Sequence, residues 1–98
     1  MGMEQLRVLT EQFEWTTAQG VTVTGFNPPK KGVTNVHRKP FFIKYITSKG
    51  VVESGVCTCI RVDTTKRMRR VRYEASGQIR WVRDYLVMEV NGIKIVTH

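Results

Sequence analysis

The sequence predicts a single, mostly β domain over residues 1–98, folded as a small antiparallel barrel or a strongly bent sheet, with room for one short N-terminal helix. Two observations support this fold class. Short runs in which apolar and polar residues alternate recur along the chain, separated by turn-forming residues. The length of 98 residues is that of one domain, and the hydrophobic fraction of 41% is ordinary for a folded protein.

The N-terminal segment 3–12 fits two different elements. As a short helix it would place Met3, Leu6 and Phe13 roughly on one face, and as an edge strand it would place Leu6 and Val8 together. The sequence leaves both open.

Strands dominate the rest of the chain. Most are expected to pair as hairpins, because glycine and other small or polar residues separate them. The expected strands are 13–17, 21–24, 41–47, 51–52, 56–62, 69–74, 78–82, 86–90 and 93–96. The expected turns are 18–20, 48–50, 63–66, 75–77 and 91–92.

The segment 27–40 is predicted to be a long basic loop within the domain. Pro28 and Pro29 cannot donate hydrogen bonds to a sheet, and Gly32 and Pro40 add further breaks. A loop of this length in a compact domain is either functional or mobile.

Two local signals fix the C-terminal part. Asn91-Gly92 tolerates the positive φ angles of a two-residue type I′ turn, so we expect a hairpin there. Between residues 79 and 90 the alternation changes phase, which predicts a β-bulge or a single 3₁₀ turn near 83–85. Short strands, tight turns and one such break are typical of small barrels of the SH3-like or OB-like kind. That analogy concerns architecture and does not assign a function.

The charge of the chain favours an anionic partner. Sixteen Lys and Arg against eight Asp and Glu give a net charge of +8 and a pI near 10.0. The positive charge is concentrated in two blocks, +5 over residues 30–44 and +6 over residues 61–83.

The second block is the main candidate site. Seven of its eight basic residues are arginine, whose planar guanidinium matches phosphate oxygens and stacks on bases. If the strands pair, we expect a basic stripe across the sheet that contacts nucleic acid. Its basic residues are Arg61, Lys66, Arg67, Arg69, Arg70, Arg72, Arg80 and Arg83.

Aromatic residues are interleaved with this block. Tyr73 and Trp81 share their parity with Val71 and Ile79, so both are expected in the core. Tyr85, at the change of phase, is the candidate for stacking on a base.

The first block could form a flexible arm that reaches phosphates or a minor groove, or a merely solvated loop. Its basic residues are Lys30, Lys31, Arg38, Lys39 and Lys44.

Metal binding, cofactors and catalysis are not expected. Cys57 and Cys59 form a C-x-C pair without a second cysteine pair, and are interpreted as reduced, partly buried thiols. No nucleophile has an elbow-type glycine context, and no glycine-rich phosphate loop is present. Asp63 and Asp84 lie among arginines and are interpreted as salt-bridge partners.

The sequence therefore predicts a non-enzymatic, cytoplasmic nucleic-acid-binding module without a membrane span or cofactor, and leaves DNA and RNA undistinguished. The alternative is a protein-interaction or assembly module, which would pair through sheet edges, including with a second copy, or dock an acidic partner on the same face.

Overall fold

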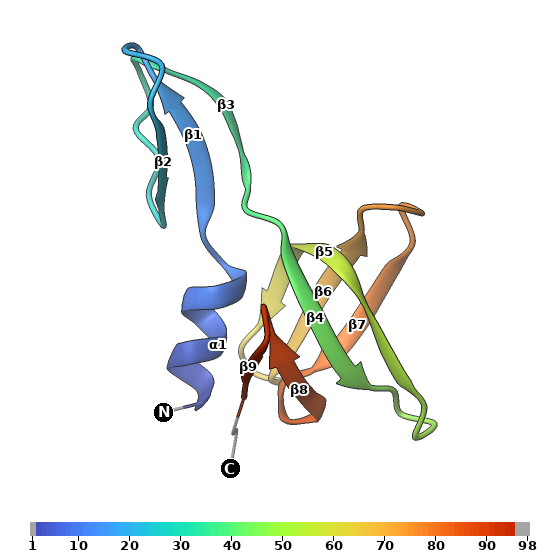
Figure 1. Ribbon diagram of the computed structural model, residues 1–98. Helices are drawn as coiled ribbons and strands as arrows, with labels where there is room; N and C mark the ends of the chain where they lie inside the picture. The colour runs from blue at the N-terminus through green and yellow to red at the C-terminus, as the bar shows by residue number, and fades with distance from the viewer. Residues whose placement is uncertain (1, 96–98) are drawn as a thin grey trace.

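The computed structural model describes residues 2–95 and shows an elongated, mostly β molecule of 46 × 31 × 25 Å. The molecule contains two antiparallel sheets (Figure 1). We call the six-stranded sheet the body and the three-stranded sheet, which projects from it, the arm. The predicted fold class is confirmed at this level, with one short N-terminal helix.

That helix, α1 (Gly2–Thr10), settles the choice for the N-terminal segment. The Leu6 side chain is fully buried in the core of the body. The hydroxyl of Thr10 donates to the carbonyl of Leu6 at 2.7 Å, so this polar side chain is satisfied inside the helix itself. The helix therefore covers one end of the body (Figure 1).

The arm consists of β1 (Phe13–Thr17), β2 (Thr22–Gly25) and β3 (Val33–Arg38), in the order β2-β1-β3. The predicted first hairpin is confirmed. The prediction of a loop over 27–40 is wrong for residues 33–38, which form β3 and pair antiparallel with β1, whereas residues 27–32 are a loop as predicted. The prolines and glycine that suggested a loop lie outside this strand, since two prolines and Gly32 precede it and Pro40 follows it.

A buried tryptophan on β1 packs against β2 in the arm. The side chain of Trp15 is 7% exposed, and a Cβ added at Gly25 would lie 3.0 Å from its ring. At the base of the arm, the Arg38 guanidinium lies 4.2 Å from the ring centroid of Phe13 and donates to the carbonyl of Glu11 at 2.6 Å. Arg38 thus ties the arm to the end of α1.

The body has the strand order β7-β6-β5-β4-β8-β9. Its strands are β4 (Phe41–Ile46), β5 (Val52–Asp63), β6 (Met68–Tyr73), β7 (Ile79–Arg83), β8 (Val87–Val90) and β9 (Ile93–Lys94). Among the described residues β7 and β9 do not pair with each other, so the sheet bends strongly without closing into a barrel. Of the two predicted forms, the bent sheet is the one observed.

The long strand β5 makes the bend. The predicted strand 56–62 and Val52 of the predicted strand 51–52 belong to one strand of 12 residues, and Val51 precedes it. Its first half pairs with β4 and its second half with β6. A Cβ at Gly55 would lie 2.7 Å from the ring of Tyr73, so glycine is required where this ring packs onto β5.

The core lies inside the bend. It contains Leu6, Phe41, Ile43, Tyr45, Cys57, Cys59, Val71, Val82, Val87, Val90 and Ile95, with Leu9, Val62 and Tyr73 packed against it.

Both C-terminal signals are confirmed. A 3₁₀ turn, η1 (Asp84–Leu86), absorbs the change of phase between β7 and β8. Asn91 and Gly92 have φ angles of 52° and 80°, as a type I′ turn between β8 and β9 requires. Val96, expected in the last strand, lies outside the described residues.

Candidate functional site

The outer face of β5, β6 and β7 gathers arginines and an aromatic ring. Arg61, Arg70 and Trp81 are cross-strand partners in one row, and Arg72 lies in the next row opposite Ile79. Directly opposed residues point to the same face of a sheet. We call Arg61, Arg70, Arg72 and Trp81 the arginine face.

A β-bulge puts Arg61 on this face. By simple alternation Arg61 would share the buried side of β5 with Cys57 and Cys59. The register between β5 and β6 shifts between Cys59 and Arg61, and the guanidinium is exposed beside Arg70 instead.

The length of the β6–β7 turn determines whether the Trp81 side chain points into the core or outward. With the predicted three-residue turn, Trp81 would lie opposite Val71 and point inward. The observed turn is one residue longer, because the Tyr73 N–H donates to the Gln78 carbonyl at 2.8 Å. A one-residue slip exchanges the two faces of a strand. The prediction of a core Trp81 is therefore wrong, since the side chain is 45% exposed and Arg80 lies opposite Val71.

The arginine face lacks compensating acids. Within residues 2–95, none of its three arginines forms an ion pair. The guanidinium of Arg70 lies 5.8 Å from the ring centroid of Trp81, and its buried Nε has no hydrogen-bond partner among the described residues. The carboxylate of Asp63 accepts the N–H of Lys66 at 3.0 Å and so caps the β5–β6 turn, and it forms no ion pair with a described residue.

Arg69 does not belong to the surface, contrary to the sequence-based assignment. Its side chain is 4% exposed on the inner side of β6. It forms an ion pair with Glu11, and its Nε lies 3.2 Å from Oδ1 of Asp84. Nη1 also donates to the hydroxyl of Thr10 at 3.1 Å. The predicted salt-bridge role of Asp84 is thus confirmed, and Arg69 is a structural residue.

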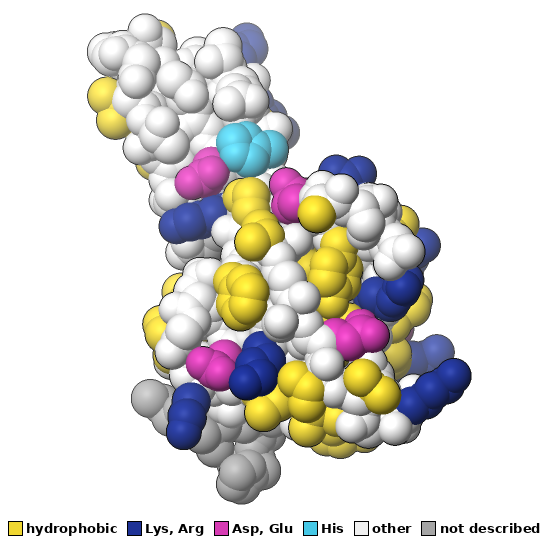
Figure 2. All heavy atoms as spheres, turned by 45° about the vertical axis from the view of Figure 1, so that its right-hand side comes forward, with side chains coloured by type: hydrophobic (Ala, Val, Ile, Leu, Met, Phe, Trp, Pro, Cys, Tyr) yellow, Lys and Arg dark blue, Asp and Glu magenta, His cyan; other side chains and the backbone are white. Residues whose placement is uncertain are grey.

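The remaining basic residues of this block surround the face. Lys66 and Arg67 are exposed in the β5–β6 turn. Arg80 and Arg83 are exposed on β7, and Arg80 donates to the Gln78 side chain at 2.9 Å and to the Ile79 carbonyl at 3.0 Å. Figure 2 shows basic side chains along one side of the body.

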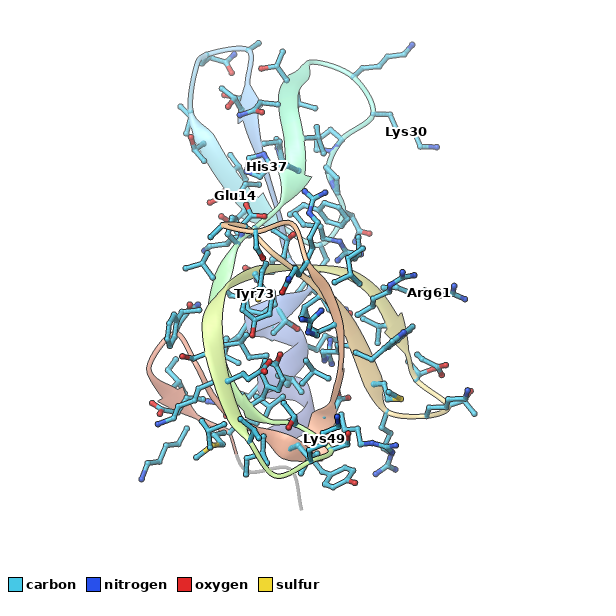
Figure 3. All side chains as sticks on the ribbon, turned by 90° about the vertical axis from the view of Figure 1, so that its right-hand side faces the viewer. Glu14, Lys30, His37, Lys49, Arg61 and Tyr73 are labelled. Carbon is cyan, nitrogen blue, oxygen red and sulfur yellow. The ribbon has the colours of Figure 1, made fainter. Side chains whose placement is uncertain are left out.

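The basic residues of the first block, 30–44, differ in their exposure. Lys30 and Lys31 are exposed in the β2–β3 connection, whereas Arg38 and Lys39 are half-buried at the base of the arm. In Figure 3 the side chains of Lys30 and Arg61 project to the same side of the molecule. Lys44 lies 3.8 Å from Glu89 in an exposed ion pair.

A groove adjoins the arginine face. It has a volume of about 460 Å³ and lies between the β4–β5 hairpin and β7, with Leu86 of η1 also in its wall. Trp81, Arg80 and Arg83 line one side, and Lys49 lies on the other. Tyr85, the predicted stacking residue, is 63% exposed on η1 and does not line this groove.

The two thiols lie in the core of the body, and His37 lies on β3 of the arm. Cys57 and Cys59 are free and fully buried, and burial raises the pKa of the Cys57 thiol to about 11. Nε2 of His37 donates to the carboxylate of Glu14 at 3.1 Å, and the hydrogen bond of Nδ1 to the Asn35 carbonyl raises the pKa of His37. Within the described residues no three His, Cys, Asp or Glu side chains lie together as metal ligands would. His98 lies outside them.

Three comparisons with known proteins found no match. No protein-family model, curated protein or solved structure matches the chain. In residues 2–95 no helix has the length and apolar character that crossing a bilayer requires.

Proposed function

We propose that this protein is a non-enzymatic nucleic-acid-binding module that contacts phosphates through the arginine face. The observation that carries the proposal is the direct opposition of Arg61 and Arg70, with Arg72 in the next row and no acid within residues 2–95 paired to any of them. Like charges directly opposite each other on a sheet destabilise it. An anionic ligand would relieve this repulsion.

The residue type and its neighbours favour phosphate over other anions. Guanidinium groups bind phosphate oxygens with two parallel hydrogen bonds, and an array of them along a sheet matches a repeating anion. Exposed Arg83, Lys66 and Arg67 extend the positive surface beyond the arginine face. With a net charge of +8, the whole protein would also be attracted to nucleic acid at a distance.

We also propose a more specific fold type than the bent antiparallel sheet that is observed. We propose that the body is an open form of an SH3-like barrel, because five consecutive strands form a bent antiparallel sheet and a 3₁₀ turn precedes β8. The two free buried thiols support a reducing, cytoplasmic location.

The salt dependence of binding tests the function. If the three arginines of the face and one or both of the exposed Arg67 and Arg83 each neutralise one phosphate, log K plotted against log salt should fall with a slope of about −3 to −5. Arg72→Glu, an exposed change on β6, should weaken binding and reduce the steepness of that slope by about one or more. Fluorescence anisotropy with labelled oligonucleotides across a salt series measures both quantities.

Lys94→Glu is the matched control. Lys94 is exposed on β9, at the opposite end of the sheet from β7, and the substitution changes the net charge equally. We expect its slope to stay close to that of the original protein. A flat salt response, or equal losses for Arg72→Glu and Lys94→Glu, would refute a localised phosphate-binding face.

A second candidate function rests on a different observation. No strand among the described residues pairs with the outer edge of β7, so this edge could accept a strand from a partner protein or a second copy. In this reading the arginine face would meet an acidic partner.

A further inference from the structure

We infer that the groove between the β4–β5 hairpin and β7 accepts unpaired bases, so that the preferred ligand is a single strand. This inference rests on the proposed function and adds the class of nucleic acid. It is carried by the position of one side chain, Trp81, which belongs to the arginine face and also lines the groove.

The groove has the size and lining of a site for a flat, partly apolar group. Its volume of about 460 Å³ lies within the roughly 300–1,000 Å³ typical of small-ligand pockets. Tyr45, Met68 and Leu86 supply apolar wall, and Trp81 supplies an aromatic surface. Every base has a π-face, so stacking on such a ring needs no particular sequence.

Trp81 is exposed on a strand that pairs with β6. It lies in the middle of β7, paired with Arg70 on β6, and the Arg70 guanidinium lies 5.8 Å from the ring centroid. The Trp81 side chain is 45% exposed because its parity on β7 is not that of the core. Base and phosphate sites would therefore be adjacent, with Trp81 next to Arg70.

The charges around the groove favour a strand that carries phosphates. Arg80 and Arg83 on β7 and Lys49 at the hairpin tip provide three cations at its margin (Figure 3 labels Lys49). Among the described residues Glu53 is the one acid of the lining, and it accepts a hydrogen bond from the Tyr45 hydroxyl at 3.0 Å. In a duplex the π-faces of the bases are covered by their neighbours, so only a single strand or an unpaired end can use the groove.

The intrinsic fluorescence of the protein provides a direct test. The chain has two tryptophans, and Trp15 is buried in the arm. Titration with an unlabelled single-stranded oligonucleotide should quench Trp81 in the original protein. Trp81→Phe should bind with similar affinity because a ring remains, but the quenching should be lost since only Trp15 still emits.

Affinity measurements complete the test. We expect single strands to bind more tightly than the matching duplex, and Trp81→Ala to weaken single-strand binding by about 5- to 100-fold. Phe42→Ala is the control, because Phe42 is similarly exposed on β4 and does not line the groove. Thermal melting of each variant checks that it is folded.

The possible outcomes separate this inference from the proposed function. Salt-dependent binding of duplex equal to or tighter than that of single strands, without quenching, would overturn the groove assignment and leave the arginine face standing. Absence of binding to both forms at low salt would overturn both. Should Trp81→Ala fail to fold, the quenching difference between the original protein and Trp81→Phe decides.

Discussion

Arg69 and Arg70 are neighbours in the sequence and differ completely in their surroundings. Arg69 points into the body, where it meets Glu11 and Asp84, and Arg70 points outward beside Arg61. Burial raises the pKa of Asp84 more than the facing Arg69 lowers it, so this pair is held at an electrostatic cost. The sequence predicted a basic cluster here, but composition alone cannot tell which arginine is buried with a partner.

Removing Arg69 should be strongly destabilising. Arg69→Met would leave the buried Asp84 carboxylate and the partly exposed Glu11 carboxylate without their common partner, and we expect a loss of about 3–5 kcal/mol in the free energy of unfolding. The double variant Arg69→Met/Asp84→Leu should recover much of this loss, because neither charge remains buried. Urea denaturation measures both variants, with the exposed substitution Lys66→Met as control. A double variant as unstable as the single one would contradict this explanation.

The destabilisation caused by Arg69→Met should depend on pH, in a direction set by the raised pKa of Asp84. A buried Asp with a raised pKa binds its proton more tightly in the folded protein than in the unfolded chain. Its contribution to stability is therefore more favourable in acid, and is lost as the pH rises through the folded pKa. The destabilisation of Arg69→Met should accordingly be larger at neutral than at acidic pH.

At the level of elements, the arm and the body differ in how much they bury. Within residues 13–38 Trp15 alone is buried, whereas the body encloses a continuous core. Most strands and turns could be predicted from alternation and turn residues. The bulge before Arg61 and the extra residue in the β6–β7 turn could not, because a period of two fixes parity and not the length of a turn. These two one-residue shifts determine which side chains form the arginine face.

Native-state hydrogen exchange should resolve the two sheets. We expect amides of β1–β3 to exchange faster than those of β4–β6, since the arm can open while losing little buried apolar surface. The comparison is internal to one sample and needs no variant. Equal protection in both sheets would mean that the arm and the body open together.

For the whole molecule, the sequence predicted a small bent or closed β structure and could not decide between the two. Closure depends on whether the terminal strands of the sheet meet, and this follows from twist and register along all six strands. The open sheet leaves the outer edge of β7 without a partner among the described residues, flanked by the charged side chains of Arg80 and Arg83. Charged residues on an edge strand discourage pairing with another copy.

The charged residues on the unpaired edge of β7 predict the oligomeric state. We expect a monomer mass that does not change with concentration, because the charged edge and a net charge of +8 oppose self-association. Multi-angle light scattering over a concentration series measures this mass. A mass that rises with concentration would favour the assembly role over nucleic-acid binding.

The two cysteines give the molecule built-in reporters of its own opening. Both thiols lie on β5 at the centre of the body, and the raised pKa of Cys57 keeps it protonated at neutral pH. A thiol-reactive reagent can reach them only when β5 separates from the core. Alkylation rates would thus time the rare openings of the body alone, without an introduced label and unaffected by movements of the arm.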